Sequence, residues 1–281
     1  AKIEVTNGYL VRESMNDDYI VAVFVIVDDM LKAMNCQTDV RAHISHAEVI
    51  TVGIVASKYF CNNHERALCI MQRLGYIGKL SVSRFNRRIH QLETTFLWLF
   101  GLIGECFQRE GVFIIDTCPL PVCRYSRANR CRKAQGKPYF GYCASQKTRY
   151  FGFQLHLVCD NHGVPVAFEV LPASWDELYP LQHLLANLPE QSQVVADKGY
   201  ICDRDWGLAY YYGDVTIHTE YRNNMRGEPN LLVKQYRKQV ETVFSQLEKM
   251  GIQRLHASTL DGFYLKVMAS LSALAFTNFI D

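Results

Sequence analysis

The spacing of apolar residues divides the chain into two parts of different texture. Up to about residue 108, apolar residues recur every three or four positions, which predicts amphipathic helices. We expect Asp17 and Asp18 to cap the first helix. Its apolar stripe consists of Ile20, Phe24, Val27, Leu31 and Met34. The first part is therefore predicted to be helical.

Three more helices are predicted in this part. Ser45 and Glu48 stand in S-x-x-E order, which predicts a capping box at the start of the second helix. A third helix is expected over residues 63–74, ending before Gly75. The fourth begins near Ser81 and is predicted as one long helix, because a single apolar stripe runs along it. The stripe is formed by Phe85, Ile89, Leu92, Phe96, Leu99, Ile103 and Phe107.

The third and fourth helices, joined across residues 75–78, resemble a helix-turn-helix. Basic residues lie early in the fourth helix: Arg84, Arg87, Arg88 and His90. In one interpretation this helix contacts DNA. In the other, the basic residues are only the solvated face of an all-helical region. The connection is longer than that of the strict motif, and both interpretations stay open.

From residue 111 onward the texture is rich in strands. Residues 111–117 (GVFIIDT) form a short apolar run that predicts a buried strand with Asp116 at its C-terminal end. Residues 150–159 and 164–172 predict two more strands, separated by a hairpin turn. Residues 193–197 (QVVAD) predict another buried strand, which ends in Asp197.

Helices are predicted between and after these strands. We expect Asp176 to cap a helix that runs to about Leu188. Further expected elements are a helical stretch to about residue 212, a strand over 214–219, a loop around 227–229, a helix over 231–250 and an apolar helix over 263–279.

The resulting order, β, β, β, α, β, α, β, α, is that of a ribonuclease H-like α/β fold, a mixed sheet flanked by helices. We predict two domains, a helical N-terminal region over 1–108 and this domain over 109–281. In the predicted topology the first and fourth strands are parallel neighbours. Acids at their ends would then come within metal-bridging distance, because adjacent strands lie about 4.8 Å apart.

The composition excludes several classes of protein and cofactor but does not by itself assign a function. With 49% hydrophobic and 21% charged residues the chain is an ordinary globular protein, and a net charge of +2 does not by itself indicate a nucleic-acid partner. The ten cysteines lack zinc-finger spacing, which favours scattered reduced thiols. We expect no secretory leader and no membrane span in the early sequence. The sequence contains no phosphate-binding loop motif, so nothing in it indicates a nucleotide cofactor.

Asp116, Asp197 and Glu241 form the sharpest group of candidate catalytic and metal-binding residues. Phosphoryl transfer on DNA needs an activated water or 3′-hydroxyl and a stabilised leaving oxygen. Two Mg²⁺ ions roughly 3.5–4 Å apart supply both, and Mg²⁺ prefers carboxylate oxygens. Other acids compete for two of these positions: Glu248 for the third, and Asp203 and Asp205 for the second.

A basic stretch from Thr117 to Cys159 contains no acid. Its candidate DNA-binding residues are Arg124, Arg127, Arg130, Arg132, Lys133, Lys137, Lys147 and Arg149. Like charges repel one another unless a counter-charge such as the phosphate backbone is present, so the stretch is predicted to contact DNA. Tyr125, Tyr139, Phe140 and Tyr142 are interleaved and could stack on unpaired bases. The alternative is a flexible, solvated loop.

Three segments resemble the acidic motifs of insertion-sequence DDE transposases, most of all the group numbered nine-eighty-two: IIDTCPL, ADKGY and RKQVETVFSQLEK. The resemblance runs from about residue 111 to the end, and more loosely over the helical part. It implies that Asp116, Asp197 and Glu241 are the first, second and third acids. Arg237 matches a basic residue of the third motif. The family lysine falls where this chain has Glu248, with Lys249 one step later, so a lysine role is left open.

The resemblance also implies an activity. The protein would bind the terminal inverted repeats of a mobile element as double-stranded DNA, cleave them with two Mg²⁺ ions (or Mn²⁺), and join the freed 3′-hydroxyl to target DNA. Lys198, Arg237 and Lys238 join the candidate DNA-binding residues. A homodimer on DNA in a bacterial or archaeal cytoplasm is expected. The alternatives are a ribonuclease H-like nuclease or resolvase that does not join DNA, and a non-catalytic transposase-derived DNA-binding protein.

Overall fold

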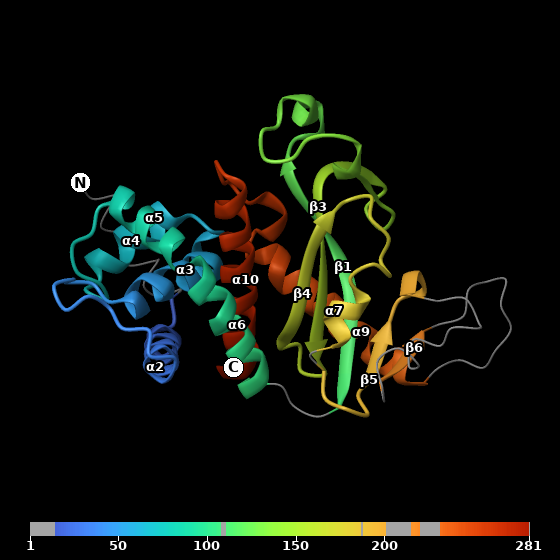
Figure 1. Cartoon of the computed structure of the whole chain (residues 1–281), viewed down its shortest axis with the longest axis horizontal. Helices are drawn as coiled ribbons and strands as arrows, with labels where there is room; N and C mark the ends of the chain where they lie inside the picture. The colour runs from blue at the N-terminus through green and yellow to red at the C-terminus, as the bar shows by residue number, and fades with distance from the viewer. Residues whose placement is uncertain (1–14, 108–110, 187, 201–214, 220–230, 281) are drawn as a thin grey trace, which may run out of the picture. The chain divides into compact units, whose positions relative to one another are not determined.

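The computed structural model describes residues 15–107, 111–186, 188–200, 215–219 and 231–280. These residues form two compact units, each assembled from separate stretches of the chain (Figure 1). The first, here called the helical unit, contains described residues from 1–102, 249–252 and 256–281. The second, the sheet unit, contains described residues from 103–248 and 253–255.

The helical unit is built from helices, as the apolar spacing predicts. They are α2 (Asp17–Ala33), α3 (His46–Phe60), α4 (His64–Arg73), α5 (Val82–Gln91), most of α6 (Glu93–Phe107) and α10 (Leu260–Ile280). The centre of this unit is formed by α3 and α10, whose side chains are buried on nearly every side. Hydrogen bonds connect α10 to the N-terminal helices: Tyr19 Oη donates to the carbonyl of Ala273 (3.2 Å), and Asn62 Nδ2 donates to Ser270 Oγ (3.0 Å).

Helix ends follow local side-chain chemistry. The predicted capping box of α3 is confirmed, since Ser45 and Glu48 exchange side-chain and backbone hydrogen bonds. The predicted caps of α2 were wrong. Asn16 is the N-cap, and its side chain accepts a hydrogen bond from the Tyr19 amide. Asp17 and Asp18 lie inside the first turn, where their negative charge interacts favourably with the helix dipole.

The predicted long fourth helix was also wrong, because the chain breaks at Leu92 into α5 and α6. The apolar spacing continues through this single non-helical residue, so periodicity alone does not reveal the break. The final helix, α10, is long and apolar enough to cross a membrane. However, 67% of its most apolar window is buried inside the protein, as expected of a core helix.

The described part of the sheet unit contains a six-stranded mixed sheet. Its strands are β1 (Val112–Cys123), β2 (Phe140–Cys143), β3 (Thr148–Asp160), β4 (Pro165–Pro172), β5 (Gln193–Ala196) and β6 (Thr216–Thr219). Their order is β2-β3-β1-β5-β6, and β4 also pairs with β3. β1 and β5 are parallel neighbours, which confirms the predicted adjacency of those strands. The ribonuclease H-like fold class is therefore confirmed.

Alternating side chains of β1 face two different helices. Phe113 and Ile115 belong to an apolar cluster with α7 (Leu181–Leu185). Ile114 and Asp116 point the other way, toward α9 (Leu231–Lys249), where they line a small cavity with Val240 and Phe244. The sheet is thus covered by a helix on each face, and Asp116 lies on the sheet face that α9 covers.

Three details of the sheet unit differ from expectation. Asp116 lies in the middle of β1, not at its end, because the antiparallel ladder with β3 continues to Cys123. Asp176 does not cap the next helix: its Oδ1 accepts from the Leu178 amide, and α7 begins only after Pro180, because a residue before proline avoids helical geometry. Strand β2 lies within the basic stretch, where no strand was predicted. The expected helix to about residue 212 and the loop at 227–229 fall outside the described residues.

Candidate functional site

Two of the three candidate acids lie side by side through strand pairing. The parallel ladder of β1 and β5 ends at the pair Ile115 and Ala196. The next residue on each strand is an acid, Asp116 on β1 and Asp197 directly after β5. Among the described residues, β1 has no parallel partner beyond its ladder with β5, so this edge of the sheet opens where the two acids stand. The site therefore forms where the ladder ends, as is usual for open α/β sheets.

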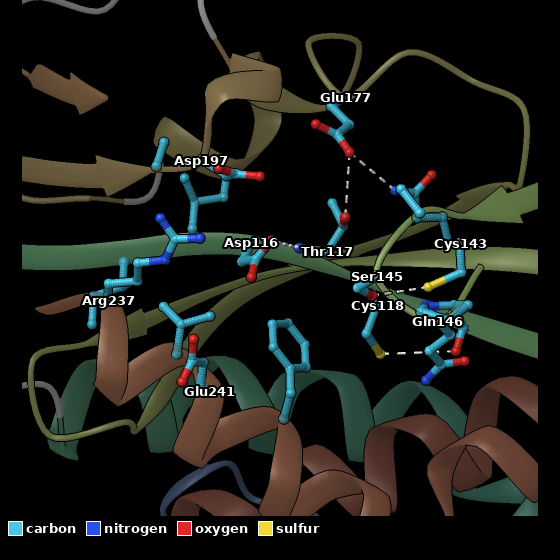
Figure 2. A pocket seen from close by; sticks show the side chains of 18 of the residues that line it. Asp116, Thr117, Cys118, Cys143, Ser145, Gln146, Glu177, Asp197, Arg237 and Glu241 are labelled. Carbon is cyan, nitrogen blue, oxygen red and sulfur yellow. Dashed lines mark hydrogen bonds between the residues drawn. The ribbon is translucent and has the colours of Figure 1, made fainter. Parts of the chain in front are cut away.

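A cavity of about 570 Å³ occupies this opening. Asp116, Asp197 and Glu241 all line it, Glu241 from the middle of α9 (Figure 2). Arg237 lies one turn before Glu241 on the same helix and also lines the cavity. The fold thus brings the three predicted acids to one cavity, together with one predicted cation.

Burial and neighbouring charge raise the pKa of Asp116 to about 7. Burial is the larger cause, and the negative charges of Asp197 and Glu177 add to it. Two interactions oppose the shift: the Thr117 amide donates to Asp116 Oδ1 (2.7 Å), and the positive charge of Arg237 favours the ionised carboxylate. Although Asp116 faces the cavity, it therefore holds its proton more readily than an ordinary aspartate.

The donor chemistry of this cavity fits a divalent cation. Carboxylate oxygens are the ligands that Mg²⁺ and Mn²⁺ prefer, and a cation would relieve the repulsion that Asp116 experiences from its neighbours. Within the described ranges, no three Asp, Glu, His or Cys side chains already surround one point where an ion could bind. Asp116, Asp197 and Glu241 line the cavity and are the predicted residues that could hold such a cation.

A further acid, Glu177, lines the same cavity and was not predicted as a site residue. Thr117 Oγ1 and Gln154 Nε2 both donate to its Oε1, at 3.4 Å each. Burial raises the pKa of Glu177, and the charge of Asp197 raises it further. The sequence signal for it is an acidic pair, Asp176 and Glu177, after a predicted strand, and only Asp176 has a predicted role, as a helix cap.

Tyr200 anchors the turn that follows Asp197. Its ring is buried, and its Oη lies 3.5 Å from Nδ1 of His156 on β3. Burial lowers the pKa of His156 to about 4, so this histidine is neutral near pH 7. His156 Nε2 has no hydrogen-bond partner among the described residues. The pair therefore holds the turn of Asp197 against the sheet.

The rival acids differ in their surroundings. Glu248 also lines the cavity, but it accepts from Gln253 Nε2 (2.9 Å) and acts electrostatically on Cys118, two residues beyond Asp116 on β1. Glu241 instead shares a helix face with Arg237, whose charge reaches Asp116. Both glutamates line the cavity, and Glu241 as the third acid stays a prediction. Asp203 and Asp205 lie outside the described residues.

The basic stretch is partly ordered by secondary structure, namely two short 3-10 helices, η1 (Tyr125–Arg130) and η2 (Lys137–Tyr139), followed by β2. Its exposed cations are Arg124, Arg127, Arg130, Arg132, Lys137, Lys147 and Arg149, while Lys133 is half-buried. None of the eight lines the cavity, whose wall here is formed by residues 142–146. The cations are therefore on the surface of the segment that borders the cavity.

Three of the four interleaved aromatic residues contact another ring, and Tyr125 does so edge-on against Phe140 at 5.7 Å between ring centroids. Tyr139 packs edge-on against Phe153 at 5.2 Å between ring centroids, and Phe140 packs against Phe151 at 4.8 Å. Tyr125 and Tyr142 are exposed, at 43% and 61%. These last two are the most exposed of the four and therefore the most accessible to stack on a base.

The other candidate cations are scattered. Lys238 is exposed on α9 and does not line the cavity, and Lys198 lies in η3 (Lys198–Tyr200), with its side chain outside the described part. On α5, Arg84 and Arg87 are exposed, whereas Arg88 donates to the carbonyl of Ile44 (2.8 Å). Arg88 thus has a structural contact inside the helical unit.

Comparison with known proteins supplies the family. A family model described as a transposase DDE domain matches residues 106–258, more than half of the chain. No curated protein and no solved structure matches the chain. The matched segment contains Asp116, Asp197 and Glu241, the three acids that line the cavity. The chain therefore belongs to the transposases with a DDE domain.

Proposed function

We propose that this protein binds the double-stranded ends of a mobile element, cleaves them, and joins the freed 3′-hydroxyl to target DNA. The observation that carries the proposal is the pair Asp116 and Asp197, adjacent at the end of the β1–β5 ladder in a cavity that Glu241 also lines. Membership of the DDE transposase family supports it, since that family acts on DNA and generally uses divalent metals.

Asp116, Asp197 and Glu241 are the residues that would hold two Mg²⁺ ions, with Mn²⁺ as a substitute. Bound there, the ions would activate a water or 3′-hydroxyl and stabilise the leaving oxygen. The Thr117 amide fixes one oxygen of Asp116. Arg237, whose charge favours ionised Asp116, would also attract the phosphate that enters the cavity.

DNA would approach the cavity along the basic stretch. Its seven exposed cations lie on the segment that borders the cavity through residues 142–146, so they could contact phosphates on either side of the bond that is cut. Tyr125 and Tyr142 could stack on unpaired bases at a cleaved end. Because two element ends must be processed, we propose that two copies of the chain act together on DNA, in the cytoplasm of a bacterium or archaeon.

A strand-transfer assay tests the proposal. Labelled ends of the element that encodes the chain are incubated with a plasmid target in Mg²⁺ or Mn²⁺, using wild-type protein and Asp197→Asn. We expect joined products with wild type and none with the variant. Cleavage without joining would instead favour a nuclease, and tight binding without either reaction would favour a non-catalytic DNA-binding protein.

Matched variants separate the roles of single acids. Asp116→Asn is expected to abolish cleavage and leave DNA affinity nearly unchanged, because it removes a carboxylate without removing a DNA contact. Glu241→Gln should abolish cleavage, whereas Glu248→Gln should retain it. The reverse result for the two glutamates would assign the third position to Glu248.

A further inference from the structure

Glu177 is an acid of the cavity that the three-acid description leaves without a role. It follows β4 and precedes α7, so it reaches the cavity from a different part of the fold than β1, β5 or α9. Figure 2 shows its carboxylate directed toward the same opening as Asp116 and Asp197.

The two oxygens of Glu177 have different surroundings. Oε1 accepts from Thr117, the neighbour of Asp116, and from Gln154 on β3. Oε2 accepts no hydrogen bond that connects it to a described residue, and it lies against Gly199, two residues after Asp197, so closely that a Cβ at Gly199 would overlap it. The carboxylate is therefore held in place through Oε1, while Oε2 remains available as a ligand.

The charge of Glu177 has a cost that its hydrogen bonds do not require. Both bonds go to an oxygen acceptor, and the amide oxygen of a glutamine could also accept them, although more weakly than a carboxylate. A glutamine would also avoid the repulsion from Asp197. The repulsion from Asp197 therefore disfavours a second negative charge at this position, and a cation bound in the cavity would offset that repulsion.

We infer that Glu177 is a fourth carboxylate of the divalent-cation site and strengthens cation binding together with Asp116 and Asp197. This inference rests on the proposed function, because it takes the cavity to be the metal site. It extends the donor set to a residue that adjoins both acid-bearing segments, through Thr117 on one side and Gly199 on the other.

Calorimetric titration of the metal-free full-length protein with Mn²⁺ tests the inference without depending on catalysis. Glu177→Gln keeps the acceptor for Thr117 and Gln154 but removes the charge. Asp176→Asn is the matched control, since it removes an exposed carboxylate one residue away. We expect Glu177→Gln to weaken Mn²⁺ binding by about 10-fold or more. Asp176→Asn should stay within about twofold of wild type.

A second variant tests position separately from charge. Gly199→Ala retains every carboxylate but displaces Glu177, because its methyl group would occupy the space of Oε2. It should also weaken Mn²⁺ binding. Circular dichroism and thermal unfolding without metal serve as the folding check, and Glu177→Gln should unfold no earlier than wild type, since it relieves repulsion.

The possible results distinguish the inference from the proposed function. If Glu177→Gln binds Mn²⁺ like wild type while Asp197→Asn loses binding, Glu177 is not part of the site but the metal site stands. If Asp116→Asn and Asp197→Asn also leave Mn²⁺ affinity unchanged, the proposed metal site itself is wrong. Early unfolding of Glu177→Gln without metal would mean that Glu177 is only a structural contact.

Discussion

At Asp116, burial and nearby negative charge act in the same direction, so the folded protein pays for keeping this carboxylate ionised. Its pKa in the folded state is about 7, against 3.8 for an ordinary aspartate. Between these values the folded state binds more protons than the unfolded state, so the free energy of unfolding falls as pH rises from about 4 to about 7. This stability is present below pH 4 and lost above pH 7.

We therefore expect Asp116→Asn to stabilise the metal-free protein in a pH-dependent way. At pH 4 the variant and wild type should unfold at similar temperatures. At pH 8 the variant should be more stable by about 1–3 kcal/mol, a value discounted because part of Asp116 faces water in the cavity. Thermal unfolding in a chelator across this range measures the difference. Parallel pH profiles of the two proteins would show that the pKa of Asp116 is not raised in the folded protein.

At the scale of elements, the close approach of β1 and β3 at Gly152 sets a steric limit. A Cβ at Gly152 would lie 2.8 Å from the Val122 amide and overlap the carbonyl of Leu120, both backbone atoms of β1. Backbone cannot move aside as a flexible side chain can. This contact is one point of the ladder from Phe113 to Cys123 that pairs β1, the strand that carries Asp116, with β3.

Gly152→Ala is accordingly expected to destabilise the protein by about 1–3 kcal/mol, the usual cost of overpacking. Gly101→Ala in α6 is the matched control, because a Cβ there meets nothing within 4 Å. Removing a glycine from a helix interior should stabilise by up to about 1 kcal/mol. Urea unfolding of both variants checks the opposite signs, and equal effects would contradict the steric account.

The basic stretch permits a prediction at the same scale. If Arg127 and Arg130 contact phosphates, the double change to Gln should make the negative slope of log affinity against log salt shallower by about 2, close to 0.9 for each lost contact. Arg41→Gln is the control, since Arg41 pairs with Asp39 in the helical unit. Fluorescence anisotropy with a DNA end at several salt concentrations gives the slopes. An unchanged slope would leave the stretch as a solvated surface segment.

The pairing of β1 with β5 was predictable because each contains a short apolar run followed by an acid. The proximity of Asp116 and Asp197 followed from that pairing, although Asp116 lies inside β1 and not at its end. Strand β2 was not predictable, because its four residues, FGYC, have no clear alternation and are fixed only by pairing with β3. Glu177 was missed for a related reason. Its partners Thr117 and Gln154 are 60 and 23 residues away, and no local pattern reports contacts of that kind.

At the scale of the whole molecule, the helical unit combines the N-terminal helices with α10. Phe276 of α10 is fully buried, whereas Phe279 of the same helix is 37% exposed. The predicted boundary near residue 108 stays a prediction, and a fragment ending there would lack α10.

These two phenylalanines form a matched pair for a test. Phe276→Ala should cost about 3–5 kcal/mol and increase amide hydrogen exchange in α3, more than 200 residues earlier in the chain. Phe279→Ala should cost much less and leave the exchange of α3 near wild type. Equal exchange of α3 in both variants would mean that α10 contributes little to the helical unit.

The contribution of α10 has a consequence for how the protein is made. Tyr19 and its hydrogen-bond partner Ala273 are separated by 254 positions. At about 5–20 residues per second, the ribosome needs roughly 10–50 seconds to synthesise that interval. During this time α2 and α3 have left the ribosome while the apolar surface that α10 will cover is still bare, so the nascent chain depends on chaperones or on transient collapse. A ribosome that stalls within the sheet unit would therefore release a product with an incomplete helical core, a natural substrate for proteases.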